Sequence, residues 1–462
     1  MNMKSLTKPI ASEWLLSMMI ALFGVLSCKK ETKQIPLPEK IAIASNNNAH
    51  GHLKQAKEYS SNLVVRWLNM QLDMLRVPLA AGTGSQASER CQAYCGIVLY
   101  ESVLPGMPPY RSLSGQLTDF PEMPATERGK AYHWAASANA ALAAINRKLF
   151  PATSEVNITS MNNLESSLQA VYATEVDSET LKRSIAFGKE VAARVYGWAA
   201  TDGSANINPA YVPAVGPGLW VPTASTPPIG TYQEQRRLLV PHVEDGTTLE
   251  SPPAYSADPN SAFYAMFKDV YDKSLTLTAD QTATAIYYRD APGYPGGGHF
   301  VSILSQLLTT VQPALDFAAL LYAKVGIGQY DASVICFRNK YHYNQIRPIT
   351  YIRNEMGHPG WSPLIPTPNH PEFPSAHAVN NASVVEMLTN MFGDNFHFAL
   401  HTYDYLGLPA RSFNSFYEMG KEMSNSRVFG GIHCQSSCDK GSMQGKRVAQ
   451  NILNTIRFLK DE

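Results

Sequence analysis

The sequence predicts an all-α protein with the architecture of a helical bundle. Two stretches, residues 50–200 and 261–458, carry apolar residues at three-to-four spacing, which is the period of a helix with one buried face. The strict alternation that predicts β-strands is scarce in both stretches. The chain has 462 residues, of which 45% are hydrophobic, so it is long enough to bury a large core. Together these observations indicate helices packed on helices.

Five helices are expected in the first of these stretches. Each shows the three-to-four spacing over three turns or more. The expected helices are residues 52–75, 88–103, 126–149, 163–173 and 178–200. We therefore delimit an N-terminal helical region at residues 49–201.

The middle of the chain breaks this pattern. Residues 202–259 contain ten prolines together with repeated Gly, Thr and Ser, so this segment is expected to be irregular and to wrap the surface or the rim of a pocket. Helical spacing resumes in residues 260–462, which we delimit as the catalytic helical domain. The spacing is interrupted at residues 290–298 and at residues 359–371, where five prolines occur.

The N-terminus has the pattern of an export signal. Two lysines precede the apolar stretch Leu15–Leu26, which is too short to span a bilayer and leads to Ser27-Cys28. Residues 1–28 thus resemble a bacterial lipoprotein signal in which Cys28 receives the lipid, and an ordinary signal peptide or uncleaved anchor is the alternative. Residues 29–48 are polar and fit a tether. We expect a lipid-anchored protein of the bacterial cell envelope, facing the periplasm or the cell surface.

The charge balance gives no case for nucleic acid as a partner. The 38 Lys and Arg residues equal the 38 Asp and Glu residues, and no run of basic residues stands out.

Export would make disulfides possible. Cys91 and Cys95, like Cys434 and Cys438, stand four residues apart, where a bridge needs some distortion. A pairing across the two segments is equally allowed by the sequence. Cys336 lies in an apolar run and is expected to be buried and free.

Three short clusters in the last third of the chain carry the chemistry. They are Lys340-x6-Arg347-Pro348, Pro374-Ser375-Ala376-His377 and Ser426-Arg427-x5-His433. Their main polar groups are one Lys, two Arg and two His with a serine at a helix start, and no carboxylate is among them. Side chains of these types bind a tetrahedral oxyanion rather than a metal cation. Each cluster alone is a weak signal, whereas all three in one chain favour an enzyme with an oxyanion site.

The spacings within the first two clusters support this interpretation. Lys340 and Arg347 are seven residues apart, so a helix would present both cations on one face. Pro348 would then end that helix. Ser375 precedes an apolar run and is expected to be the N-cap of a helix whose free N–H groups face an anion. His377 falls in the first turn of that helix.

The third cluster contains a glycine pair, Gly430 and Gly431, between Arg427 and His433. The pair is expected to break or kink a helix and to turn His433 back toward the anion. His433 would then serve as an apical ligand or as a nucleophile.

The clusters resemble the signature of the vanadium-dependent haloperoxidases, which share a helical core with the type 2 phosphatidic acid phosphatases and the bacterial non-specific acid phosphatases. The similarity extends through Tyr288–Gly293, Gly298–Phe300, Asp331–Ala332 and Phe429–His433, so it covers residues 280–460. The resemblance implies the helical bundle of this superfamily.

The resemblance also implies how an oxyanion would be held. Lys340, Arg347 and Arg427 would bind its equatorial oxygens, with help from Ser375 and the backbone N–H of Ala376. Lys340 would also count among the catalytic groups. The family usually has Gly where Ala376 stands, so the N–H survives while a methyl group crowds the site.

Five further assignments follow from the resemblance. His433 would coordinate vanadium at the apex, and His377 would be the acid–base group opposite. Asp290 resembles the acid that pairs with an active-site arginine, and His370 and Phe337 would stand beside the cage. Chloride-oxidising fungal members carry Phe at the position of His370, and algal bromide-oxidising members carry a second His. His370 therefore favours bromide or iodide.

The implied function is a vanadate-dependent haloperoxidase that oxidises a halide with hydrogen peroxide to hypohalous acid, with vanadate as the cofactor and neither haem nor a nucleotide. The alternative is a secreted acid phosphatase, in which the cage holds a phosphomonoester, His433 attacks phosphorus and His377 protonates the leaving group. A lipoprotein that merely binds an oxyanion or a partner is a third interpretation, but binding alone gives no reason for two histidines to face each other across the anion.

Overall fold

The computed structural model describes residues 54–76, 85–290 and 298–461. All of them belong to one unit, residues 35–462. The predicted signal sequence with Cys28 and the predicted tether lie outside the described residues. None of the described helices is long and apolar enough to cross a membrane.

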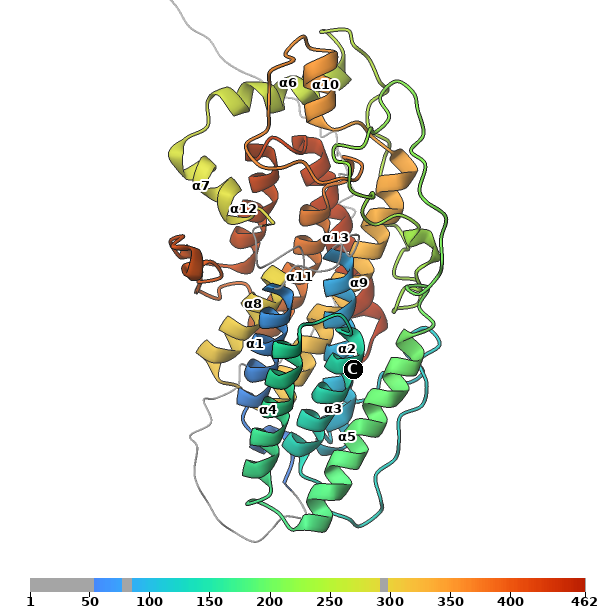
Figure 1. The fold of residues 1–462 in the computed structure, drawn as a ribbon, viewed down its shortest axis with the longest axis vertical. Helices are drawn as coiled ribbons and strands as arrows, with labels where there is room; N and C mark the ends of the chain where they lie inside the picture. Colours follow the sequence, from blue (N-terminus) through green and yellow to red (C-terminus); the bar gives the residue numbers. More distant parts are fainter. Residues whose placement is uncertain (1–53, 77–84, 291–297, 462) are drawn as a thin grey trace, which may run out of the picture. The chain divides into compact units, whose positions relative to one another are not determined.

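The protein is all-α, which confirms the predicted fold class (Figure 1). The α-helices of the described residues are α1 (Asn62–Arg76), α2 (Ser85–Val103), α3 (Trp134–Leu149), α4 (Glu155–Tyr172), α5 (Ser178–Ala199), α6 (Ala262–Leu275), α7 (Ala279–Tyr287), α8 (Gly298–Val311), α9 (Leu315–Tyr343), α10 (Pro348–Asn354), α11 (Ala376–Phe392), α12 (Phe416–Phe429) and α13 (Gln435–Thr455). Short 3-10 turns are η1 (Ala56–Glu58), η2 (Leu104–Gly106), η3 (Gln233–Gln235) and η4 (Asp404–Leu406). The strands β1 (Phe398–Leu400) and β2 (Arg411–Phe413), which the sequence did not indicate, form an antiparallel pair.

Polar caps set where the helices of the N-terminal half begin. The side chains of His133, Ser154 and Asp177 accept hydrogen bonds from first-turn N–H groups of α3, α4 and α5. Helix α4 therefore begins at Glu155 rather than at the predicted residue 163, because the cap fixes its first turn.

Helices α1 and α3 begin later than predicted, at Asn62 and Trp134. The single turn η1 precedes α1, and the residues before α3 run as turns and extended chain up to His133. The segments before α1 and α3 contain apolar residues at helical spacing, but they do not form helices.

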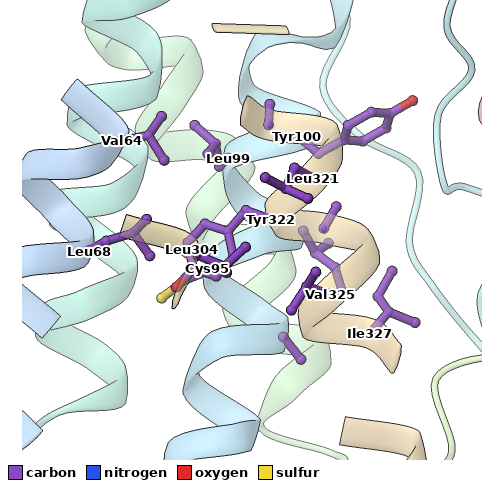
Figure 2. Packing of buried hydrophobic residues seen from close by; sticks show 14 of the residues in the cluster. Val64, Leu68, Cys95, Leu99, Tyr100, Leu304, Leu321, Tyr322, Val325 and Ile327 are labelled. Carbon is purple, nitrogen blue, oxygen red and sulfur yellow. The ribbon is translucent and has the colours of Figure 1, made fainter. Parts of the chain in front are cut away.

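One hydrophobic core joins the N-terminal helices to the catalytic helices. Figure 2 shows Val64 and Leu68 of α1, Leu99 of α2, and Leu321 and Val325 of α9 in one buried cluster. The two predicted halves therefore pack around the long central helix α9.

Two glycines allow the backbones of α2 and α9 to touch. A Cβ at Gly96 would lie 2.6 Å from the carbonyl oxygen of Tyr322, and one at Gly326 would lie 2.8 Å from that of Gln92. Any side chain at either position would push the helices apart. This close approach fixes α2 against the helix that carries Lys340.

Helix α13 lies equally close to α11. A Cβ at Gly445 would lie 1.9 Å from the carbonyl oxygen of Val379, and one at Gly441 would lie 3.0 Å from that of Ser375. The first turns of α11 are thereby held against α13.

The Pro-rich segment is irregular, with η3 as its short helical turn. It is tied to α9 by the buried carboxylate of Asp331, which accepts hydrogen bonds from the N–H groups of Leu239 (2.7 Å) and Val240 (3.0 Å). The segment therefore covers the side of α9.

The described cysteines are all free and buried. Neither of the i, i+4 pairs nor a pairing across the two segments forms a disulfide, and Cys336 is buried and free as predicted.

Candidate functional site

A cavity of about 50 Å³ lies between α2, α8, α9, α11 and α12. Its wall includes, from the predicted site, Asp290, Phe337, His370, Ala376, His377, Arg427 and His433. Lys340, Arg347 and Ser375 are fully buried beside these residues. The fold thus gathers the predicted residues, which are spread over more than a hundred positions of the sequence, around one cavity.

Lys340 and Arg347 do not share a helix face, which corrects the expectation from their spacing. Helix α9 ends at Tyr343, because Asn344 adopts the left-handed conformation with φ 46°. Arg347 is extended and forms the N-cap of α10, and Pro348 occupies the first turn of α10 rather than ending α9. One cation therefore comes from a helix end and the other from a helix start.

Backbone oxygens fix the guanidinium group of Arg347. Its Nε donates to the carbonyl oxygen of His370 (2.7 Å), and its Nη1 donates to that of Ile432 (2.8 Å). Nη1 also lies 3.2 Å from Nε2 of His433, and Nη2 lies 2.9 Å from Nδ1 of His370. Arginine can only donate, so both of these ring nitrogens act as acceptors and carry no proton.

Glu372 sets the tautomer of His433. Its Oε1 lies 3.0 Å from Nδ1 of His433 and accepts from the N–H of Cys434 (2.9 Å), and its Oε2 accepts from the hydroxyl of Ser437 (2.6 Å). The proton of the imidazole therefore sits on Nδ1, facing the carboxylate. Nε2 carries the lone pair, which accepts from Nη1 of Arg347 in this structure and would bind a metal or attack phosphorus once that hydrogen bond is given up.

Glu372 is a functional residue that the sequence interpretation missed. The motif clusters were read as free of carboxylates, whereas Glu372 stands three residues before Ser375 and is fully buried. An acidic residue between two prolines, next to a predicted anion-binding N-cap, is the signal that could have identified it.

The glycine pair before His433 acts as predicted. Helix α12 ends at Phe429 with Gly430 as its C-cap, and Gly431 has φ +76°, which favours glycine. The N–H of Ile432 then bonds back to the carbonyl oxygen of Arg427 (3.2 Å). The chain reverses there and brings His433 to the cavity.

Ser375 is the N-cap of α11, as predicted, but its hydroxyl does not cap the helix. The hydroxyl is buried and makes no hydrogen bond to any residue that the structure describes. The first N–H groups of an α-helix, here including that of Ala376, have no partner inside the helix. This helix start can therefore offer both hydroxyl and N–H donors to an anion.

His377 opens onto the cavity, with 22% of its side chain exposed. Its Nε2 lies 3.5 Å from Oδ1 of Asp290. Removal from water lowers the pKa of His377, the charge of Arg427 lowers it further, and Asp290 opposes both effects. The imidazole is therefore neutral at pH 7 and can accept a proton.

Lys340 and Arg347 are buried cations. Nζ of Lys340 donates to the carbonyl oxygens of Pro371 (2.9 Å) and Glu372 (3.1 Å). Burial and the charge of Arg347 lower the pKa of Lys340 to about 7, and burial lowers the pKa of Arg347 to about 10. Each charge is thus destabilised in the absence of an anion.

Arg427 completes the cationic group. Its Nη1 donates to the carbonyl oxygen of Tyr288 (2.6 Å), while its buried Nε makes no hydrogen bond. Burial lowers its pKa as well, against the charge of Asp290. The three cations face the buried carboxyl of Glu372 and the partly exposed carboxylate of Asp290, and an oxyanion would stabilise the cations further and satisfy their unused donors.

The remaining predicted residues stand on the cavity wall. Asp290 has 43% of its side chain exposed. The rings of Phe337 and His370 pack edge to face with their centroids 5.2 Å apart. Burial lowers the pKa of His370 well below its usual value, so the imidazole of His370 is neutral.

Two further residues of the cavity wall, Glu89 and His299, lie outside the three sequence clusters. Glu89 reaches the cavity from α2 in the N-terminal half, a contact that no local pattern signals. His299 lies in the first turn of α8, is buried with both ring nitrogens free of hydrogen bonds, and has its pKa lowered to about 3 by burial.

A family model described as the VCPO second helical-bundle domain matches residues 320–461. No curated protein sequence matches the chain. A bacterial vanadium-dependent iodoperoxidase has a similar solved structure, with a TM-score of 0.79 and 27% identity over 87% of this chain and 97% of that chain.

Two structures of bacterial vanadium-dependent chloroperoxidases share the fold. The apo-type structure has a TM-score of 0.63 and 14% identity over 87% of this chain and 99% of that chain. The holo-type structure has a TM-score of 0.57 and 13% identity over 83% of this chain and 95% of that chain.

Proposed function

This chain belongs with the vanadium-dependent haloperoxidases, and we propose that it oxidises a halide with hydrogen peroxide to hypohalous acid. The observation that carries the proposal is the buried cage. Arg427, the start of α11 and His433 line one small cavity, Lys340 and Arg347 are buried beside it, and burial has lowered the pKa of each cation. A bound oxyanion would stabilise these buried charges.

We infer that vanadate is this oxyanion. Lys340, Arg347 and Arg427 would bind its oxygens together with the Ser375 hydroxyl and the N–H of Ala376. When bound, vanadate would supply the Lewis-acid chemistry that activates hydrogen peroxide, which is the oxidant. The protein contributes charge neutralisation and orientation, both of which burial strengthens because the local dielectric is low.

The two histidines have different parts in this proposal. His433 would be the vanadium ligand through Nε2, because Glu372 holds its proton on Nδ1. His377 is neutral and open to the cavity, so it would take and return a proton at Nε2, with Asp290 stabilising the charged form. The acid–base work and the metal bond thus belong to separate rings.

Bromide or iodide is the proposed halide. His370 lines the cavity as a neutral ring packed against Phe337, so the halide side of the site offers a polarisable, uncharged surface. The likeness to a bacterial iodoperoxidase supports the same preference.

Phosphomonoester hydrolysis is the second candidate. A lone pair on Nε2 with a carboxylate behind Nδ1 is also the arrangement of a histidine nucleophile, and the cage would fit phosphate equally well. The two functions make opposite forecasts for vanadate, which would activate the first and inhibit the second.

One assay separates the candidates. Purified protein, with and without added orthovanadate, is tested for peroxide-dependent oxidation of iodide and bromide and for hydrolysis of p-nitrophenyl phosphate. Vanadate-dependent halide oxidation is expected. It should vanish in Arg427→Met and persist in the matched variant Arg447→Met, whose arginine is exposed on α13. Phosphatase activity that vanadate inhibits, without halide oxidation, would overturn the proposal.

We also propose that the protein is exported and held in the cell envelope by a lipid on Cys28. The support is the sequence pattern of an apolar stretch that ends in Ser27-Cys28.

A further inference from the structure

Glu89 of α2 borders two cavities. It lines the active-site cavity of about 50 Å³ and also a smaller one of about 10 Å³. The other residues around the smaller cavity are Arg90, Gln233, Arg236, Tyr330, Ser333 and Val334. The side chain of Arg236 is 24% exposed, whereas Glu89 is only 2% exposed. One buried carboxyl group therefore stands between the reaction site and a side of the protein that reaches solvent.

Among the described residues, only one oxygen of Glu89 has a hydrogen-bond partner. Oε1 accepts from Nδ2 of Asn380 (2.8 Å), which stands one turn after His377 on α11. Oε2 is buried and makes no hydrogen bond. The adjacent Arg90 instead pairs with Asp202, with Nε and Oδ2 2.6 Å apart. A buried carboxyl group in this state is costly, and its free oxygen is available to exchange a proton.

Two polar groups near the smaller cavity share this lack of partners. Within the described residues, the hydroxyl groups of Tyr330 and Ser333 are buried and make no hydrogen bond, although that of Ser333 is near enough to Glu89 to lower its pKa. Such groups are normally satisfied by ordered water, and the volume of about 10 Å³ is close to what one water molecule needs. Hydroxyls, water and a carboxyl group can pass a proton along, because each can both donate and accept.

The proposed reaction consumes protons. One halide ion, one molecule of hydrogen peroxide and one proton give one hypohalous acid and one water. The halide loses two electrons, the O–O bond breaks, one oxygen joins the halogen, and the other leaves as water with the added proton. Solvent can reach the cavity beside Asp290, whose side chain is 43% exposed, and a buried acid elsewhere on the wall would supply this proton by a second route through the protein.

We propose that Glu89 is a proton relay that takes protons from the smaller cavity and releases them into the active-site cavity, which His377 shares. The proposal rests on the proposed haloperoxidase function. Glu89 acts through the cavity and through His377, and it has no part in holding the anion.

The acidity of Glu89 suits a relay. Burial raises its pKa to about 7, the nearby Ser333 hydroxyl lowers it, and the charge of Asp290 raises it again. The group thus gains and loses a proton near neutral pH, and delivery should decline as the pH rises above 7. The titratable and charged groups around it are Arg90, Arg236, Asp290, His299, Tyr330, Cys336 and His377.

Glu89→Gln tests the relay, because the amide keeps the size and the bond from Asn380 but carries no exchangeable acid proton. We expect unchanged vanadate affinity by equilibrium dialysis, turnover lowered roughly 100-fold, and loss of the decline near pH 7. Glu89→Asp should restore part of the turnover. The matched control is Glu101→Gln on the same helix, since Glu101 is also buried with a pKa near 7 but lines neither cavity.

Infrared difference spectra give a readout that needs no halide. A protonated carboxyl band should titrate near pH 7 in vanadate-free protein, and Glu89→Gln should remove its contribution. The same carboxyl titration in wild type and Glu89→Gln, or full turnover with an unchanged pH profile in Glu89→Gln, would overturn the relay alone. If the wild-type protein shows no vanadate-dependent halide oxidation, the proposed function is wrong, and the relay proposed for that reaction is wrong as well.

Discussion

Lys340 should make anion binding depend on pH, and sulfate is a suitable probe because it stays a dianion from pH 6 to 9. In the anion-free protein, burial and the charge of Arg347 lower the pKa of Lys340 to about 7. A bound dianion favours the protonated ammonium, so binding should take up a proton above pH 7. Affinity is therefore highest at low pH and falls as pH rises.

The size of the effect follows from the protonated fraction of Lys340. With a pKa of about 7 this fraction is near nine-tenths at pH 6 and near one-hundredth at pH 9. If only the protonated form binds, the dissociation constant should rise roughly 100-fold between these values, which is about 2.7 kcal/mol. Burial lowers the pKa of both His377 and His433, so both rings are neutral in the anion-free protein, and we assign the slope to Lys340.

Isothermal titration calorimetry of sulfate at several pH values measures this slope, and buffers of different ionisation enthalpy count the protons taken up. Lys340→Met should bind weakly at every pH and lose the slope. Lys324→Met is the matched control, because Lys324 is a buried lysine of the same helix that donates to Asn390 (2.7 Å). Affinity that is flat with pH in the wild type, or a slope that persists in Lys340→Met, would refute the reasoning.

Three further outcomes are expected. His433→Ala should sharply reduce vanadate affinity in equilibrium dialysis, while His377→Ala should keep much of it and lose roughly 100- to 10,000-fold in turnover; equal affinity in wild type and His433→Ala would contradict the ligand role. Gly445→Ala should lower the free energy of unfolding by about 1–3 kcal/mol in denaturant titrations, because its Cβ would lie 1.9 Å from the backbone of α11. The control is Gly197→Ala in α5, whose Cβ would meet nothing within 4 Å; it should be neutral or stabilising by up to about 1 kcal/mol. Cys28→Ser should abolish metabolic lipid labelling and release soluble protein, and unchanged membrane association would point to another anchor.

The fold class was predictable because the apolar spacing that indicates a helix lies within the sequence of that helix. The three-to-four spacing of apolar residues indicated a helical protein, and the prolines of residues 202–259 marked the irregular segment between its halves. Helix starts were less predictable, as for α4, because a single capping side chain such as Ser154 moves the first turn by several residues.

In the candidate site, too, some features were predictable from the sequence and others were not. The sequence by itself determined which side chains are present and how two of them are presented: Ser375 begins a helix, and Gly430 and Gly431 end one before His433. These are local conformational preferences, so they can be read from neighbouring residues.

Only the tertiary structure decided the charge and proton chemistry. Glu372 meets His433 across 61 residues of sequence, and Glu89 meets Asn380 across 291. Arg347 reaches the cage from the start of a second helix, against the expectation from its spacing to Lys340. Desolvation sets the acidity of these groups, and desolvation depends on how distant helices pack together, which no local pattern of residues specifies.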